Sequence, residues 1–582
     1  MTAPAGAPAP PHATDEAGAS GDVGDVGDSG DAGLPAPEEE RRRRRPRRLS
    51  LTGGVLGLAF GAMSATPSLV PRGWLIEGLL AGVSIAVGYG LGAFVGWAYR
   101  ALGLPDLPAG VRRVTWKVLA VLAVVGLLVM GWLGRWWQSG QRELLGMDTA
   151  VPWLWLLAPL LGLVVAALLI GLGRAVKALG RLLFRLLRRV LPVRVAWLIA
   201  IVATGLLTWT LLSGVLVGNA LEVADSVFAS NNDEDKPGVV NPELDTRSGG
   251  PTSKVSWASI GREGRAFVWS GLTAEEISTV VGDADAVEPV RAFVGLEAAP
   301  TPTERAQLAV AELRALGGFD RGAIAVAGGT GSGWIDPRAA DALEYATHGD
   351  VATVSMQYSY LPSWLSFLVD QSRAATNAEQ LITALRVELD GMPADSRPDL
   401  YVYGESLGAF STDSAFTSVE DMSTTTDGAL LIGPPSFDTT WQKVVAGRET
   451  GSPVWKPLYG DGGLVRVATT ADDLTDQTLT WTTDNPIIYL THASDPIVAW
   501  TADHDAWLDP RGPDVSRYVV PWPVVAGLQA TFDQFNANGV PAGHGHVYDE
   551  TTVTAWSEIV GPPSLPDAEV AAIQAAVKDL PH

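Results

Sequence analysis

The sequence predicts a protein in two parts: an all-α transmembrane bundle of about five helices, followed by an α/β domain with a mainly parallel sheet flanked by helices. Two observations predict this. Five apolar stretches follow one another within the first 220 residues, and beyond residue 260 short apolar runs alternate with helical segments. About 20 apolar residues are needed to cross a bilayer core, and strands separated by helices are typical of a parallel sheet.

The first 48 residues are expected to be a disordered tail. They consist largely of Ala, Pro, Gly, Asp and Glu, so they contain too few large apolar side chains to form a core. The tail ends in the basic run Arg41–Arg48, which directly precedes an apolar stretch and therefore indicates membrane topology rather than nucleic-acid binding. The net charge of −23 also disfavours a nucleic-acid partner, and the absence of Cys excludes disulfides and thiol chemistry.

Residues 49–220 are expected to form the transmembrane domain, in contact with the lipid bilayer. The segments that would face one side of the membrane carry 18 Lys and Arg, and those that would face the other side carry only 3. Positive charge concentrates on the cytoplasmic side, so we expect a multi-pass protein of the cell membrane with a cytoplasmic N-terminus and an extracytoplasmic C-terminal domain. The expected spans are about 51–71, 75–98, 115–134, 152–172 and 196–218.

The polar, turn-rich residues 221–260 are expected to be a linker, and residues 261–582 to be the α/β domain. Within this domain a helix is predicted over 375–389 and another from about residue 566. Buried strands are predicted at 323–329, 351–358, 399–404, 428–435 and 486–496.

A candidate nucleophile follows the third of these strands. Gly404 to Gly408 spell G-x-S-x-G around Ser406, and a helix start follows. The motif by itself is weak, since the chain contains 64 Gly. A serine hydroxyl needs a base, an acid that orients the base, and donors for the oxyanion. On an α/β-hydrolase sheet the partners follow in the order Ser, then Asp or Glu, then His.

The sequence after Ser406 supplies these partners in that order. Asp495 comes at the end of an apolar run and is the preferred acid, with Asp484, Asp503 and Asp505 as rivals. For the base, a Gly-rich loop carries two histidines ahead of a helix-like stretch. His546 is the first choice because it stands closer to that helix, and His544 remains open.

The oxyanion donors are expected to be the backbone N–H of Leu407 and a second N–H from the loop at Gly329 and Thr330. A nucleotide-binding turn is the competing interpretation of this loop. It is disfavoured because neither G-K-[ST] nor a correctly spaced G-x-G-x-x-G is present. No cofactor and no metal site are expected.

The chain resembles a family of bacterial membrane proteins with an N-terminal transmembrane region and a C-terminal α/β-hydrolase catalytic domain. The blocks that carry the resemblance include "PSLVPR", "RAFVGL", "GTGSGWIDP", "YGESLGAFS", "IGPPSF", "YLTHASDPIVAW" and "PAGHGHVYDE". The resemblance extends over nearly the whole chain from about residue 49. It implies an α/β-hydrolase-like fold and a Ser-His-Asp triad with serine as nucleophile, which corresponds here to Ser406, Asp495 and His546 or His544.

These observations favour a membrane-anchored serine hydrolase that acts on an acyl ester of a lipid or cell-envelope component. Residues 360–370 are apolar and are expected to form either a wall of the substrate pocket or part of the core. An acyltransferase with the same triad is the first alternative. A transporter or channel with a non-catalytic outer domain is another, although the spans contain few ionisable residues. The substrate and the oligomeric state stay open.

Overall fold

The computed structural model describes residues 49–105, 107–211, 213, 219–476, 478–501, 504–561 and 564–580. The expected tail with its arginine run (residues 1–48) lies outside these residues, as do residues 212 and 214–218 of the last expected span. All statements below concern the described part of the chain.

The C-terminal domain is built on one sheet of seven strands, all parallel, in the order β1-β3-β2-β4-β5-β7-β6. Every strand residue except Asp399 is buried, as expected for a parallel sheet covered on both faces. The predicted α/β fold with a mainly parallel sheet is therefore confirmed. The strands are β1 (Val290–Val294), β2 (Ala323–Gly328), β3 (Val351–Met356), β4 (Asp399–Glu405), β5 (Gly428–Ile432), β6 (Val465–Ala468) and β7 (Ile487–Leu490).

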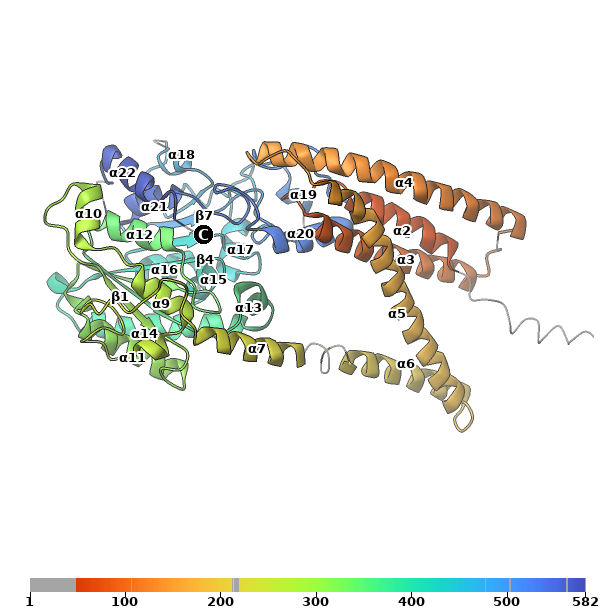
Figure 1. Cartoon of the computed structure of the whole chain (residues 1–582), viewed down its shortest axis with the longest axis horizontal. Helices are drawn as coiled ribbons and strands as arrows, with labels where there is room; N and C mark the ends of the chain where they lie inside the picture. Colours follow the sequence, from red (N-terminus) through yellow and green to blue (C-terminus); the bar gives the residue numbers. More distant parts are fainter. Residues whose placement is uncertain are drawn as a thin grey trace, which may run out of the picture. The chain divides into compact units, whose positions relative to one another are not determined.

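Two groups of helices cover the sheet. Helices α11, α14 and α15 pack on one another along one face, and α10, α12, α21 and α22 form the second group (Figure 1). The helices of the domain are α8 (Trp257–Ile260), α9 (Arg262–Trp269), α10 (Ala274–Val281), α11 (Pro302–Ala315), α12 (Pro337–Ala346), α13 (Ser363–Val369), α14 (Gln371–Asp390), α15 (Leu407–Asp413), α16 (Val419–Thr425), α17 (Thr439–Ala446), α18 (Ala471–Leu474), α19 (His504–Trp507), α20 (Val525–Asp533), α21 (Thr551–Ile559) and α22 (Asp567–Val577). Short 3-10 helices occur at η3 (Gly318–Asp320), η4 (Ala394–Ser396) and η5 (Gln534–Asn536).

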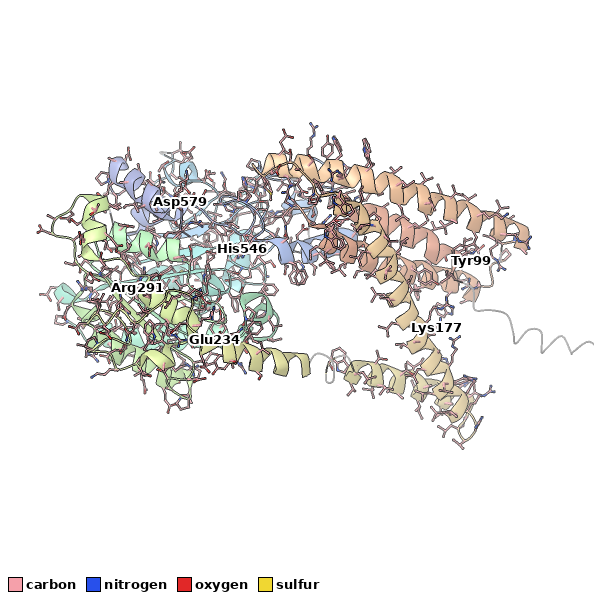
Figure 2. All side chains as sticks on the ribbon, in the orientation of Figure 1. Tyr99, Lys177, Glu234, Arg291, His546 and Asp579 are labelled. Carbon is pink, nitrogen blue, oxygen red and sulfur yellow. The ribbon has the colours of Figure 1, made fainter. Side chains whose placement is uncertain are left out.

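Strand β1 carries a fully buried arginine, Arg291, which Figure 2 labels. Its guanidinium contacts Asp341 at 2.5 Å and Glu344 at 2.6 Å, and both carboxylates are buried. A buried charge is tolerated when it is paired and hydrogen-bonded in this way. Arg247, which lies in the segment expected to be a linker, is also buried. Its backbone pairs with that of Arg291 of β1 in an isolated parallel β-bridge. This part of residues 221–260 therefore packs as part of the α/β domain.

A histidine joins three elements at the amino end of β3, whereas Ser406 lies at the carboxyl end of the neighbouring part of the sheet. His348 lies in the turn before β3, and its ring nitrogens are 2.7 Å from Asp283, which follows α10, and 2.7 Å from Glu569 of α22. Partial burial opposes protonation of the ring. The hydrogen bonds to these two carboxylates outweigh it, and the pKa of His348 is raised above its ordinary value. Protonated His348 thus stabilises the packing of these elements.

Among the described residues of the N-terminal region, three helices are long and apolar enough to cross a membrane, at Trp74–Ala101, Ala109–Leu144 and Trp153–Leu187. The first expected span forms a shorter apolar helix, Leu51–Ser64, and the described part of the last expected span belongs to an apolar helix at Val193–Trp209. The basic stretch after residue 173 continues the third long helix as far as Leu187. The elements are α2 (Leu51–Ser64), α3 (Trp74–Ala101), α4 (Ala109–Leu144), η1 (Trp153–Leu157), α5 (Ala158–Leu187), α6 (Val193–Thr210) and α7 (Asn219–Asn232).

The first expected span, 51–71, ends earlier than predicted. Helix α2 stops at Ser64, and residues 65–73 are non-helical and mostly buried. Two prolines, Pro67 and Pro71, explain the end of the helix, because proline lacks the N–H that a helix interior requires. The "PSLVPR" block therefore forms a connection between α2 and α3.

Candidate active site

Ser406 stands on a sharp turn between β4 and α15. Its backbone φ is +57° and ψ is −120°, a conformation that costs a non-glycine residue about 1 to 3 kcal/mol. The two flanking glycines are required by packing. A Cβ on Gly404 would lie 2.3 Å from the backbone carbon of Gly408, and a Cβ on Gly408 would lie 2.1 Å from the carbonyl oxygen of Gly328. The glycines therefore allow the helix to approach the sheet closely while Ser406 remains partly exposed.

Asp495 and His546 form a buried hydrogen-bonded pair. The Nδ1 atom of His546 is 2.7 Å from Oδ2 of Asp495, and the two side chains are 6% and 0% exposed. The other carboxylate oxygen accepts the backbone N–H of Ile497 at 2.8 Å. A carboxylate in this position can orient an imidazole, accept a hydrogen bond from Nδ1 and leave Nε2 as the nitrogen that can accept a proton.

Asp495 lies further beyond its strand than the sequence predicts. Strand β7 ends at Leu490, and the pairing continues only through the Thr491 N–H, which donates to the carbonyl of Ala468. The chain then turns, and the N–H of Asp495 donates to the carbonyl of His492. Asp495 is thus part of the turn that follows the strand, on the carboxyl side of the sheet.

The end of β5 lies between the serine and the imidazole. The backbone N–H of Ser406 donates to the carbonyl of Ile432 at 2.8 Å. A Cβ on the next residue, Gly433, would lie 2.7 Å from Cε1 of His546. Because β5 pairs with both β4 and β7, Ser406, His546 and Asp495 gather at one edge of the sheet. Figure 2 labels His546 at this site.

The second histidine of the loop does not contact Asp495. The nearest carboxylate of His544 is that of Asp514, at 3.9 Å. His544 also borders a cavity of about 170 Å³ whose walls include His492, Asp514 and Trp455. The geometry thus favours His546, the first choice from the sequence. Of the rival acids, Asp484 is exposed, and Asp503 and the side chain of Asp505 lie outside the described residues.

The expected oxyanion loop follows β2 and touches the serine turn. A Cβ on Gly328 would lie 2.2 Å from the carbonyl oxygen of Gly408. The N–H of Thr330, however, donates to the carbonyl of Trp334 at 2.9 Å and closes a turn, so this expected donor is already engaged. Gly329 remains the candidate for the second donor. The candidate for the first is Leu407, the first residue of α15, whose N–H lies among those that a helix leaves without an intrahelical partner.

Sequence reasoning missed Tyr548, which completes the environment of the acid. Its hydroxyl donates to Oδ2 of Asp495 at 2.8 Å, the oxygen that also contacts His546. Burial, and then the negative charge of Asp495, raise the pKa of Tyr548 well above its ordinary value, so the phenol stays protonated and can donate. The sequence offered one indication of this role, namely that Tyr548 lies only two residues after His546.

Three further polar residues hold the histidine loop, and sequence reasoning missed them also. Ser494 and Asp514 form a hydrogen bond, and Ser494 Oγ accepts the N–H of Gly545 at 2.8 Å. The ring of His492 is 2.9 Å, through Nδ1, from the Gly545 carbonyl. Gly545 itself has a φ of +53°, which suits glycine. The N–H and the carbonyl of Gly545, the residue before His546, are therefore both held.

Glu405, the residue before the serine, is buried beneath the site. Burial and then the nearby carboxylate of Asp336 raise the pKa of Glu405 well above its ordinary value. A protonated Glu405 adds no second negative charge next to Asp495. Among the described residues, no group of three His, Asp or Glu side chains is arranged to hold a metal ion.

Comparison with known proteins identifies the family of the chain. A model of the alpha/beta-hydrolase family matches residues 290–573, and a model of the N-terminus of an alpha/beta-hydrolase family matches residues 65–271. No curated protein and no solved structure matches the chain. The two models together extend over most of the sequence, and the seven-stranded parallel sheet has the fold that they describe. The chain therefore belongs to the alpha/beta-hydrolase family.

Proposed function

We propose that the protein is a serine hydrolase that cleaves an acyl ester through an acyl-enzyme. The observation that carries this proposal is the strained Ser406 turn with the buried Asp495–His546 pair at the same edge of the sheet. In the proposed reaction Ser406 Oγ attacks the acyl carbonyl and His546 takes the serine proton. His546 then protonates the leaving alcohol, which departs from the acyl-enzyme.

Deacylation reverses these roles. His546 takes a proton from water, the resulting hydroxide attacks the acyl carbon, and the carboxylic acid leaves as the proton returns to Ser406. The oxyanion of each tetrahedral intermediate would be bound by the N–H groups of Leu407 and Gly329. An alcohol in place of water would make the same site an acyltransferase, so the identity of the product decides between the two.

An aromatic cluster beside Ser406 supports a lipid-like acyl chain as the substrate group. The ring centroid of Phe410, one helical turn after Ser406, is 5.0 Å from that of Phe437, and Phe437 is 4.9 Å from Phe367 of α13. Trp500 adjoins Phe367 at 6.4 Å and is 41% exposed. These rings come from four separate segments and are not fully buried, so they offer an apolar surface that an acyl chain can cover.

We also propose that the protein is a multi-pass protein of the cell membrane with its active site outside the cytoplasm. The connections between α2 and α3 and between α4 and α5 contact the α/β domain, through Val70 and Leu145 respectively. These ends of the helices then face the same side as the active site. The opposite ends carry the basic residues, and positive charge favours the cytoplasmic side.

A fluorophosphonate probe applied to membranes that contain the full chain tests the proposal. The probe should label the wild type and fail to label Ser406→Ala, while the control Ser414→Ala, a half-buried serine of the same region, should label normally. Labelling that survives Ser406→Ala would refute the assignment of Ser406 as the nucleophile. With p-nitrophenyl esters, Phe437→Ala should reduce the preference for long acyl chains over acetate, and an unchanged preference would refute the acyl surface.

A further inference from the structure

The segment between α2 and α3 is buried against the α/β domain. Ser68, Leu69, Val70 and Arg72 are each less than one tenth exposed, and Val70 is completely buried. The contacts of this segment reach α20, η5 and the loop that carries His546. Although it lies between two apolar helices, this segment therefore contributes to the surroundings of the active site.

Arg72 is the centre of the contact. Its guanidinium contacts Glu77 at 2.8 Å and Asp533 at 3.3 Å, and all three side chains are at least 97% buried. The same guanidinium donates to the hydroxyl of Ser68 at 2.6 Å and to the carbonyl of Thr66 at 3.0 Å. A buried arginine with this many partners has a single geometry, since the planar guanidinium fits its acceptors in only one orientation.

Two side chains of α20 and one of η5 hydrogen-bond to the segment. Asp533, at the end of the helix, accepts the Ser68 hydroxyl at 2.8 Å and the N–H of Leu69 at 3.0 Å. Gln529 donates to the carbonyl of Thr66 at 2.9 Å. In η5, Asn536 donates to the carbonyl of Pro71 at 2.5 Å. The backbone on both sides of Val70 is thus held against α20 and η5.

Val70 in turn packs on the histidine loop. A Cβ on Gly545 would lie 3.4 Å from Cγ1 of Val70, and Val70 clusters with Val547 and Val540 of the loop and with Leu145 from the end of α4. The N–H of His546 donates to the carbonyl of Ala537, the residue that follows η5. Gly545 and Val547, the two neighbours of His546 in the chain, therefore both pack near Val70.

We propose that residues 68–72 position the catalytic histidine, so that the N-terminal helical region is part of the catalytic unit as well as a membrane anchor. Val70 is the positioning residue, because it packs on Gly545 and Val547 on either side of His546. Arg72, Glu77 and Asp533 hold Val70 in place. This inference rests on the proposed function, since it requires His546 to act as the base.

The test compares two valine-to-alanine variants of the full chain in membranes. Val70→Ala removes two methyl groups next to the histidine loop, and Val268→Ala removes the same groups from an equally buried site in α9. A displaced base slows chemistry more than binding. We expect Val70→Ala to lower kcat for a short-chain p-nitrophenyl ester about tenfold with KM within about twofold, and to slow fluorophosphonate labelling by a similar factor. Val268→Ala should lower only the midpoint of thermal unfolding.

Wild-type kcat and labelling rate in Val70→Ala would overturn the inference, as would an equal loss of kcat in Val268→Ala. If Val70→Ala does not accumulate as folded protein, Asp533→Asn decides the matter. That change keeps the shape of the side chain and removes the charge that Arg72 contacts, so kcat should fall severalfold with KM unchanged; an unchanged kcat would overturn the inference. A wild type that neither labels nor hydrolyses esters would instead refute the proposed function.

Discussion

The spacing between the sheet and the serine turn can be tested by replacing Gly408 with alanine. The added Cβ would lie 2.1 Å from the carbonyl oxygen of Gly328, whereas carbon and oxygen normally approach to about 3.3 Å. Helix α15 would have to move away from β2 by roughly 1 Å, and Ser406 would move with it. A misplacement of this size costs about 100-fold in rate, and overpacking of this kind costs about 1 to 3 kcal/mol of stability.

The assay measures kcat for a p-nitrophenyl ester and the rate of fluorophosphonate labelling, with the folded fraction taken from thermal unfolding. The control is Gly391→Ala. Gly391 is exposed, its φ is −79°, and the nearest atom to an added Cβ is 3.3 Å away. We expect Gly408→Ala to lose about two orders of magnitude in both rates and the control to lose none. Wild-type kinetics in Gly408→Ala would refute the idea that these glycines set the position of the nucleophile.

Three further predictions concern the histidines and the tyrosine. His546→Ala should lower ester hydrolysis by about 10² to 10⁴-fold and His544→Ala by much less, because His546 is the one of these two histidines that contacts Asp495; equal losses would contradict the assignment. Tyr548→Phe removes a hydrogen bond to a carboxylate and should lower the free energy of unfolding by about 1.5 to 3 kcal/mol in denaturant titrations, so an unchanged value would count against that bond. Because the pKa of His348 is raised in the folded state, its stabilisation is complete below the ordinary pKa and is lost as pH rises through the raised value; the thermal midpoint should fall over that range in the wild type and not in His348→Asn.

Five of the seven strands could be predicted from the sequence, because their residues are mostly apolar and their interiors carry no charge. The other two, β1 and β6, were missed, and each carries an arginine in its interior. Arg291 of β1 is neutralised by Asp341 and Glu344, 50 and 53 residues later. Arg466 of β6 donates to the carbonyls of Leu474 and Leu479. A local pattern treats arginine as exposed, so only the fold reveals that these charges are compensated.

The candidate nucleophile, acid and base could be proposed from the sequence, because the serine turn and the order of these residues can be read along the chain. The choice between the two histidines needed the structure, since His544 and His546 lie in one loop with only Gly545 between them, and the turn at Gly545 directs His546 to Asp495. Thr330 was expected to donate to the oxyanion and instead closes a turn with Trp334.

The sequence by itself determined that apolar helices precede an α/β domain and that Ser406 lies on a strand-to-helix turn, because both depend on residues close together in the chain. The tertiary structure decided the role of the α2–α3 connection. The sequence predicts Arg72 as a charged residue of a loop beside the membrane. In the structure it is buried and contacts Asp533, 461 residues away. Residues that far apart in the chain meet only in the folded protein. The burial of Arg72 therefore could not be predicted locally, because a buried charge is tolerated only where the fold supplies its counterpart.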